Sequence, residues 1–248
     1  MSAKRFLVLG SLALALLCSA QGAMLHAYSE SDDAAYRAAL SALIGQPVDY
    51  FDTRAGTPTL AQLSAYSAVM TWSNSAHANR VAYGDVLADY VDAGGRVILS
   101  AFSTYTSGNS LGGRIMTSGY SPVTSPGGSN HFVSSSYAGD GTLFYTGVGS
   151  LGFTYRDYLT VQGSGLVDGH YADGEILVAY RPDFAVFYMN GTAHAELDGT
   201  GDWVQLEANL ILWEGAAVPE PTTITLLGAG LLALGLLARS RVSRAKQD

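Results

Sequence analysis

Short apolar runs of strand length recur through the first hundred residues of the chain. They lie at residues 23–28, 48–51, 68–72 and 96–102. The last run is apolar almost throughout, as expected of a central parallel strand that is buried on both faces. Each of the four runs is therefore predicted to be a strand.

The segments between these runs show helical spacing of apolar residues and predict helices at residues 32–44, 59–63 and 79–93. Asp32 or Ser31 can cap the first helix, and glycines at 45 and at 94–95 are stop signals. The predicted inward faces consist of Ala35, Leu40, Leu43, Ile44, Val81, Val86, Leu87 and Tyr90. Strand and helix alternate as in an α/β fold, so we predict a doubly wound, mostly parallel sheet with right-handed crossovers.

The second half of the chain has a weaker pattern. Residues 103–130 are rich in Gly, Ser, Thr and Pro and predict a long surface excursion. Further strand-like pieces lie at 143–146, 158–161, 175–179 and 184–189. A last helix is expected to begin at Asp202, with Gln205 completing a variant of the capping box. Its predicted buried residues are Val204, Leu206, Leu210, Ile211 and Trp213.

The N-terminal end has the three parts of a secretory signal peptide. Lys4 and Arg5 give a positive start, and residues 6–17 form an apolar run that is too short for a comfortable membrane span. Small residues follow, and cleavage after Ala20 or after Gly22 fits equally well. We therefore expect residues 1–23 to direct export.

The C-terminal end also consists of three recognisable parts. The motif Val218-Pro219-Glu220-Pro221 precedes an uncharged stretch, 222–238, that is rich in Leu, Ala and Gly. As a helix this stretch would span about 25 Å, enough for a thin hydrocarbon core, so one C-terminal transmembrane helix is predicted. A basic cluster then closes the chain: Arg239, Arg241, Arg244 and Lys246. Such a cluster keeps the C-terminus in the cytoplasm and leaves the preceding domain outside.

This order of motif, apolar stretch and basic cluster closely resembles the PEP-CTERM sorting tail. The resemblance implies recognition by an exosortase, a membrane enzyme that processes exported proteins in bacteria that make exopolysaccharide. Glu220 and its flanking prolines would be the residues that the enzyme recognises. A plain single-pass anchor is the alternative interpretation. The predicted organisation is a signal peptide (1–23), an exported domain (24–217) and a sorting tail (218–246).

Charge separates the exported domain from the two ends. Residues 24–217 contain 7 Arg, no Lys and 19 acidic residues, a net charge of −12. Such a domain repels nucleic acid phosphates and anionic lipid headgroups, so no nucleic acid partner is expected. The acidity also keeps an exported domain soluble.

The middle of the chain is similar to class I glutamine amidotransferase-like domains, and the trehalose-utilisation-like branch is the nearest. The resemblance is carried by Leu-Ser-Ala-Tyr-Ser-Ala-Val at 63–69, Trp-Ser-Asn at 72–74, Gly-Asp-Val-Leu-Ala-Asp-Tyr-Val-Asp-Ala-Gly-Gly at 84–95, Ala-Asp-Gly-Glu-Ile-Leu-Val at 172–178 and the helix at 206–213. It covers most of residues 24–214 and implies a flavodoxin/amidotransferase-like α/β fold.

Amidotransferases of this class place a catalytic Cys after a central strand and pair it with a His. The only cysteine here is Cys18, inside the signal peptide, so the exported domain has no thiolate nucleophile and no disulfide. Ser103 follows the strand at 96–102, and His131 or His194 can serve as its base. No Gly-x-Ser-x-Gly elbow surrounds Ser103. We therefore expect a non-catalytic domain, with a serine hydrolase as the alternative.

Candidate metal and cofactor sites are weak. The five histidines show no paired ligand spacing, and the Asp-Gly turns at 168–169, 173–174 and 198–199 lack the rhythm of a calcium loop. Turn formation explains these dipeptides with fewer assumptions. We therefore expect neither a metal nor a cofactor.

Aromatic residues give a second alternative function. Four lie in or beside the Gly/Ser-rich excursion: Tyr105, Tyr120, Phe132 and Tyr137. Exposed aromatic faces beside polar loops are typical of sugar-binding surfaces, and the sorting tail indicates an exopolysaccharide setting. The sequence thus predicts an exported protein, first anchored in the inner membrane with its domain in the periplasm and then placed at the cell surface or in the extracellular matrix. Its expected partners are exosortase and the membrane, and exopolysaccharide or a protein would be the ligand of the alternative binding function.

Overall fold

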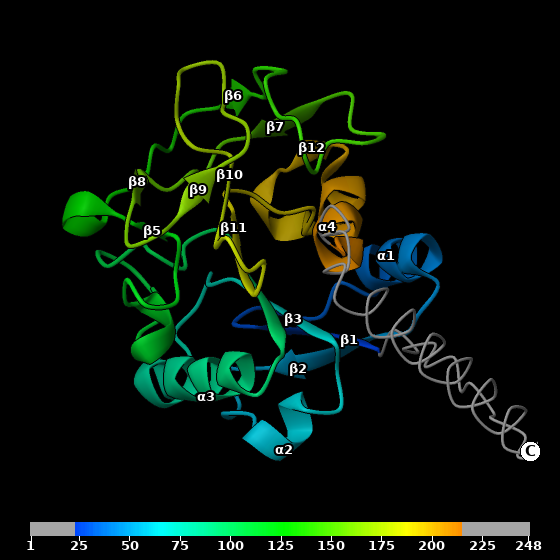
Figure 1. The fold of residues 1–248 in the computed structure, drawn as a ribbon, viewed down its shortest axis with the longest axis vertical. Helices are drawn as coiled ribbons and strands as arrows, with labels where there is room; N and C mark the ends of the chain where they lie inside the picture. The colour runs from blue at the N-terminus through cyan, green and yellow to red at the C-terminus, as the bar shows by residue number, and fades with distance from the viewer. Residues whose placement is uncertain (1–22, 215–248) are drawn as a thin grey trace, which may run out of the picture.

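The computed structural model describes residues 23–214, and a seven-stranded sheet with the order β2-β1-β3-β4-β11-β10-β9 lies at its centre (Figure 1). These strands are β1 (Met24–Tyr28), β2 (Val48–Asp52), β3 (Ala68–Thr71), β4 (Arg96–Leu99), β9 (Leu166–Val167), β10 (Val178–Tyr180) and β11 (Val186–Met189). The first five strands in the sheet order run parallel, and β10 and β9 add antiparallel at one edge. The predicted mostly parallel α/β sheet is confirmed.

Helices cover both faces of this sheet (Figure 1). The α-helices are α1 (Ala34–Ile44), α2 (Leu60–Leu63), α3 (Arg80–Asp92) and α4 (Trp203–Leu212). Side chains of β1 alternate between two cores, with Met24 and Tyr28 packed on the α1/α4 face and Leu25 and Ala27 on the α2/α3 face. Both faces of the sheet are therefore covered by helices, as in a doubly wound fold.

Local signals place the helix ends where the sequence predicts them to within two residues. The Asp33 carboxylate accepts from the Tyr36 N–H at 2.9 Å, so Asp33 is the cap of α1 in place of Asp32 or Ser31. Gly45 ends α1 with φ of 68°, a left-handed conformation that favours glycine. Thr59 forms a full capping box at α2, and Asn79 caps α3.

Several predicted inward residues face outward instead. The buried stripe of α1 is Tyr36, Leu40 and Ile44, which recur every four residues, whereas Ala35 and Leu43 are exposed. Val81 in the first turn of α3 is also exposed. The prediction failed there because it counted aliphatic residues, while the tyrosine at position 36 has the hydrogen-bond partner that lets it enter the core.

Two predicted features of the second half are wrong. Residues 143–146 are not a strand, because the backbone N–H groups of Thr142 and Leu143 donate to the Asp168 carboxylate at 2.8 Å rather than to a neighbouring strand. Asp202 makes no side-chain cap of α4. Its carboxylate instead accepts from the N–H groups of Gly149 and Ser150.

The excursion after β4 is more buried than its composition predicts. It holds η1 (Arg114–Met116), β5 (Val123–Thr124) and η2 (Pro126–Gly128), and it packs on α3. Gly84 of α3 allows this contact, since a Cβ there would lie 1.7 Å from the Gly112 carbonyl oxygen. The remaining elements are β6 (Ser135–Ser136), β7 (Leu151–Phe153), β8 (Thr160–Val161), η3 (Ala195–Leu197) and β12 (Thr200–Gly201).

A buried polar cluster joins the sheet to the helices of one face. His26 Nε2 of β1 lies 2.9 Å from Glu207 Oε1 of α4, and the Tyr36 hydroxyl of α1 donates to the other oxygen of the same carboxylate. All three side chains are buried. Because an uncompensated buried charge is costly, this cluster favours one relative placement of β1, α1 and α4.

The segments predicted to direct export and sorting lie outside the described residues. They are the signal peptide, the Val218–Pro221 motif, the apolar stretch at 222–238 and the cluster of Arg239, Arg241 and Arg244. Within residues 23–214, none of the helices combines the length and the hydropathy that a membrane crossing needs.

Candidate functional site

The carboxyl ends of the parallel strands are the first place to look for chemistry. The chain order reverses between β1 and β3, because β2 lies on one side of β1 and β3 on the other. In open α/β sheets the crevice outside such a reversal is where ligands bind. Ser29 and Ser73 follow β1 and β3 at this point and form a parallel bridge.

Three polar side chains meet beside this reversal. His77 Nε2 lies 2.8 Å from Ser73 Oγ, and His77 Nδ1 lies 2.8 Å from Thr53 Oγ1. Ser73 and Thr53 are each 1 % exposed and His77 is 8 % exposed. Burial lowers the pKa of His77 to about 4, with the positive charge of Arg80 acting in the same direction. The imidazole is therefore neutral at neutral pH, with one N–H to donate and one nitrogen to accept.

A cavity of about 100 Å³ opens on Ser73. We call it the aromatic cavity, and it is lined by Ser73, Asn74, Phe102, Tyr105, Gly108, Asn109 and Phe132. The Asn109 side-chain amide donates to the Asn74 carbonyl oxygen at 3.0 Å, and the Asn74 amide donates to Glu30 at 2.9 Å. The lining thus combines polar groups with three aromatic rings, and we call the rings of Phe102, Tyr105 and Phe132 the aromatic wall.

The aromatic wall is a connected set of rings. The ring of Phe132 packs edge-on against Tyr105 at 5.8 Å and against Tyr155 at 6.1 Å, and Phe102 lies 5.6 Å from Tyr105. Phe132 keeps 53 % of its surface exposed. An exposed phenylalanine held by two other rings offers a rigid apolar face to a ligand.

Two residues of this wall have strained backbones. Phe102 has φ of 62° and Phe132 has φ of 51°, in the left-handed region that large side chains rarely adopt. Phe102 lies in the turn directly after β4, where the chain leaves the sheet. Backbone strain of this kind costs about 1–3 kcal/mol per residue and concentrates at ligand sites.

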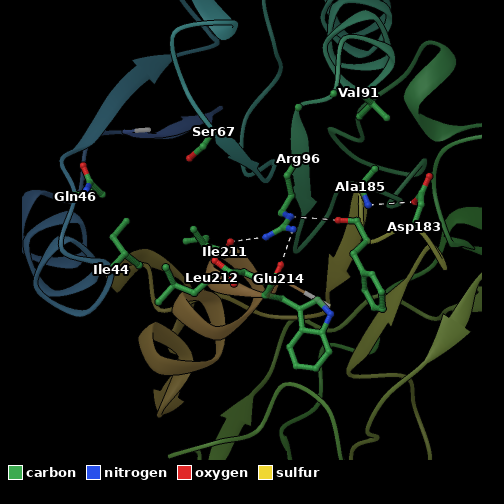
Figure 2. Close-up of a pocket in the computed structure, with 14 residues that line it drawn as sticks. Ile44, Gln46, Ser67, Val91, Arg96, Asp183, Ala185, Ile211, Leu212 and Glu214 are labelled. Atoms are coloured by element: carbon green, nitrogen blue, oxygen red, sulfur yellow. Dashed lines mark hydrogen bonds between the residues drawn. The ribbon is translucent and has the colours of Figure 1, made fainter. Parts of the chain in front are cut away.

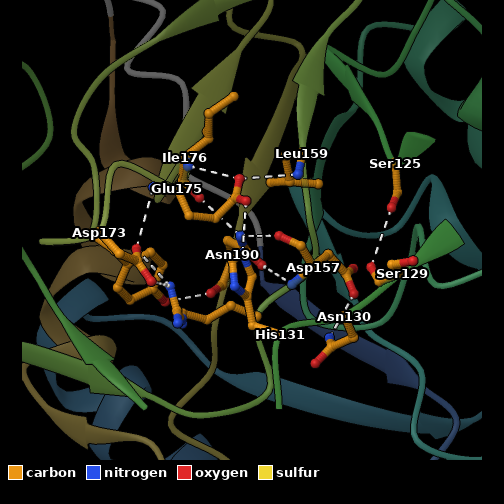
Figure 3. Close-up of polar contacts among 12 residues, drawn as sticks. Ser125, Ser129, Asn130, His131, Asp157, Leu159, Asp173, Glu175, Ile176 and Asn190 are labelled. Atoms are coloured by element: carbon orange, nitrogen blue, oxygen red, sulfur yellow. Dashed lines mark hydrogen bonds and ion pairs between the residues drawn. The ribbon is translucent and has the colours of Figure 1, made fainter. Parts of the chain in front are cut away.

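A buried carboxylate, Asp157, bonds to residues next to both parts of the aromatic wall, and its contact with Asn130 is drawn in Figure 3. Asp157 accepts from Thr104 Oγ1 at 2.8 Å, from Asn130 Nδ2 at 2.9 Å and from the Tyr188 hydroxyl. Thr104 precedes Tyr105, and the Asn130 side chain in turn accepts from the Phe132 N–H. Burial raises the pKa of the Asp157 carboxyl, and these hydrogen bonds oppose the rise.

The three residues predicted as a serine hydrolase site are not brought together. Ser103 Oγ is buried and has no hydrogen-bond partner among residues 23–214. His131 bonds to Glu175 at 2.8 Å and stacks on Tyr158 with ring centroids 3.6 Å apart (Figure 3). His194 caps η3, and its Nε2 lies 3.0 Å from the Ser31 carbonyl oxygen. Each histidine already has other partners.

The sequence predicted two of the three rings of the aromatic wall, but not the cluster of Ser73, His77 and Thr53. Of the four aromatic residues singled out in the excursion, Tyr105 and Phe132 line the cavity, whereas Tyr120 bonds to Asp92 and Tyr137 stacks on Tyr145. A signal for the cluster was present, since Ser-x-x-x-His directly follows β3.

A larger cavity lies at the opposite edge of the sheet (Figure 2). This amino-edge cavity of about 760 Å³ is lined by residues before β3, β4 and β11 and by the end of α4. The Arg96 guanidinium fills part of it and donates to the carbonyl oxygens of Phe184, Leu210, Ile211 and Trp213. Glu214, the last described residue, lies on its wall.

Metal ligands do not gather anywhere in the described range. Among residues 23–214, no three His, Cys, Asp or Glu side chains are placed to hold a metal ion.

Comparison with known proteins identifies the tail and gives relatives of the fold. Residues 217–242 match the PEP-CTERM protein-sorting motif, so the chain is an exported protein that an exosortase sorts. The structure is similar to a GMP synthase subunit from Thermoplasma acidophilum, with 10 % identity, a TM-score of 0.49 and coverage of 77 % of this chain and 92 % of that one.

It is also similar to a glutamine amidotransferase from Thermotoga maritima, with 10 % identity, a TM-score of 0.44 and coverage of 68 % and 75 %. Both are amidotransferase-like folds, the type that the sequence resembles. No curated protein matches the chain significantly. The seven-stranded sheet of this chain by itself gives the α/β architecture.

Proposed function

We propose that the exported domain of this PEP-CTERM protein binds a neutral polysaccharide of the extracellular matrix at the aromatic cavity. The observation that supports this most is the half-exposed ring of Phe132, which packs on Tyr105 in a cavity that Asn74 and Asn109 also line. The apolar faces of sugar rings pack on aromatic side chains, and their hydroxyls pair with amides. A mainly apolar cavity with a few placed polar groups is the usual form of a small-ligand site.

The charge of the domain selects the class of polysaccharide. A net charge of −12 on residues 24–217 repels uronate- or sulfate-bearing chains, so the preferred ligand is uncharged. Glu30, whose carboxylate accepts from the Asn74 amide, adds a local negative charge close to the cavity. A sugar hydroxyl, which can donate a hydrogen bond, fits beside the Glu30 carboxylate better than a negatively charged sugar does.

Binding is tested with the full-length protein in detergent, by affinity electrophoresis through gels that contain dextran or, in parallel, alginate. Dextran is expected to retard the wild type and alginate is not. Phe132→Ala and Tyr105→Ala should each weaken retardation about tenfold or more, equivalent to about 1.4 kcal/mol. Tyr120→Ala is the matched control, since this tyrosine lies in the same excursion but bonds to Asp92. Equal retardation of all four proteins would exclude the cavity as the site.

For the tail, we propose that residues 222–238 cross the inner membrane and that Glu220 is part of the signal that exosortase recognises. The domain is then held in the periplasm before it reaches the cell surface or matrix. Mass spectrometry of the mature termini, with and without Glu220→Ala, tests this assignment. A changed C-terminus in the variant is expected, and identical processing of the two would contradict it.

A further inference from the structure

We propose that Ser73 is a nucleophile, with His77 as its base, and that it removes small acyl groups such as acetyl from ester-linked hydroxyls. The proposal rests on the proposed polysaccharide binding only for the nature of the alcohol, which would be a sugar hydroxyl. The residues that take part in the reaction are Ser73, His77, Thr53 and Asn109.

The geometry is that of an activated serine. A hydroxyl becomes a useful nucleophile when a base lies within hydrogen-bond reach and a third group orients that base. Ser73 Oγ and Thr53 Oγ1 lie on opposite ring nitrogens of His77, each at 2.8 Å. In the tautomer that carries its proton on Nδ1, the ring donates to Thr53 and Nε2 accepts the proton of Ser73. Thr53 is then the positioning residue.

The position of Ser73 separates it from an ordinary buried serine. It continues β3 at the reversal of chain order and forms part of the wall of the aromatic cavity. Ser103, only a few residues beyond β4, is equally buried, but no histidine bonds to it. Ser73 thus combines a histidine within hydrogen-bond reach with a place in the lining of a cavity.

The cavity limits the acyl group to a small one. The cavity volume of about 100 Å³ is well below the roughly 300–1,000 Å³ of pockets for drug-sized ligands, so it suits an acetyl group better than a long acyl chain. Asn109 lines the same cavity, and its amide has a second N–H besides the one that it donates to Asn74. That N–H is the donor available for the negative charge that develops on the carbonyl oxygen.

The reaction has two balanced steps. Ser73 Oγ attacks the ester carbonyl carbon while its proton moves to His77 Nε2, and the bond to the sugar oxygen breaks as that oxygen takes the proton from His77. Water then attacks the acyl-serine with His77 again as base, which releases the carboxylic acid and restores the serine. The reactants are one ester and one water, and the products are one alcohol and one acid.

The test treats the full-length protein with a fluorophosphonate probe, locates the adduct by peptide mass spectrometry, and measures p-nitrophenyl acetate hydrolysis. The wild type should carry the adduct on Ser73. Ser73→Ala should abolish labelling and lower hydrolysis at least a hundredfold, and His77→Gln should lower both at least tenfold. Ser103→Ala is the matched control and should behave as wild type. No adduct on Ser73 in the wild type, or equal hydrolysis by wild type and Ser73→Ala, overturns the proposal.

Two further variants keep the result specific. Thr53→Val should lower hydrolysis about tenfold, while Thr53→Ser, which keeps the hydroxyl, should hydrolyse at the wild-type rate. If Thr53 only filled space, the valine variant, which keeps the shape of threonine, would be the more active of the two. Adduct formation and p-nitrophenyl acetate hydrolysis need no sugar ligand, and retardation by dextran needs no ester. Failure of the nucleophile and failure of polysaccharide binding are therefore seen in separate measurements.

Discussion

The two edges of the central sheet differ in what their polar groups bond to. At the amino edge, a hollow of about 760 Å³ holds one guanidinium, Arg96, whose partners are backbone carbonyl oxygens at the end of α4 and before β11. At the carboxyl edge, a cavity of about 100 Å³ lies beside a neutral buried histidine, a buried carboxylate and two strained phenylalanines. The larger hollow has the simpler chemistry.

This difference teaches that size alone does not mark a site. Arg96 completes hydrogen bonds that the last turn of a helix leaves open, which is a structural task. The carboxyl edge carries more features that cost stability, namely positive φ at both Phe102 and Phe132 beside buried ionisable groups, whereas the amino edge has one such strained residue, Phe184. A fold retains such features where they serve a ligand. Four experiments test this comparison.

The largest effect is expected from Asp157→Asn at the carboxyl edge. An amide presents N–H groups where the carboxylate accepts from Thr104, Asn130 and Tyr188, so at least one buried donor faces another donor. The free energy of unfolding should fall by about 3–5 kcal/mol. Urea denaturation measures it, and dextran retardation should be lost as well. A loss below about 1 kcal/mol would show that the network does not hold the aromatic wall.

A pH effect of similar size is expected from His77. Its pKa is about 6.5 when unfolded and about 4 when folded, so the unfolded state binds the extra proton between these values. Stability is therefore lost as pH falls from about 6.5 to about 4, by roughly 3 kcal/mol in total. Denaturation of wild type and His77→Gln across this range isolates the contribution. Parallel curves for the two proteins would contradict it.

At the amino edge, Arg96→Lys should cost less. One ammonium cannot reach all the carbonyl oxygens that the planar guanidinium contacts, so the last turn of α4 loses part of its hydrogen bonding. A loss of about 2 kcal/mol in unfolding free energy is expected, with dextran retardation and ester hydrolysis unchanged. If either activity fell with this variant, the two edges would not be independent.

The smallest expected change in stability comes from replacing the phenylalanines with positive φ, and it should differ between the two edges. Phe184, at the amino edge, also has a positive φ of 57°, but it packs on Tyr180, Phe187 and Trp213 in the hairpin between β10 and β11. Phe184→Gly should therefore lose about 1–2 kcal/mol. Phe132→Gly should stay within about 1 kcal/mol of wild type, because relief of strain offsets lost edge-on contacts. Thermal melts compare the two, and a larger loss for Phe132→Gly would contradict a ligand role for its strain.

Much of the fold was predictable because it depends on local pattern. The four strands and the helices between them follow from apolar runs. Thr59 and Asn79 cap the starts of α2 and α3, and Gly45 ends α1, as their chemistry predicts. Predictions failed where a distant group competed for the same atoms. Asp168 took the N–H groups that a strand at 143–146 would have used, and Asp202 turned to Gly149 and Ser150 rather than to α4.

The candidate site was harder to predict. Ser103 follows the longest apolar run that predicts a strand, 96–102, but no histidine bonds to it. Ser73 lies only four residues before His77, but Thr53 comes from the end of another strand, and the order of strands in the sheet brings it to the same histidine. The strain at Phe102 and Phe132 has no sequence signal, since neither residue is one that favours positive φ.

The sequence by itself determined the sorting motif, the charge of the exported domain, the absence of a thiol from it and the parallel α/β core. These depend on composition and on the order of residues along the chain, which are read directly. Only the tertiary structure decided which serine meets a histidine and which rings face a cavity. Hydrogen bonds act over about 3 Å, and that proximity is set by strand order and loop packing rather than by distance along the chain.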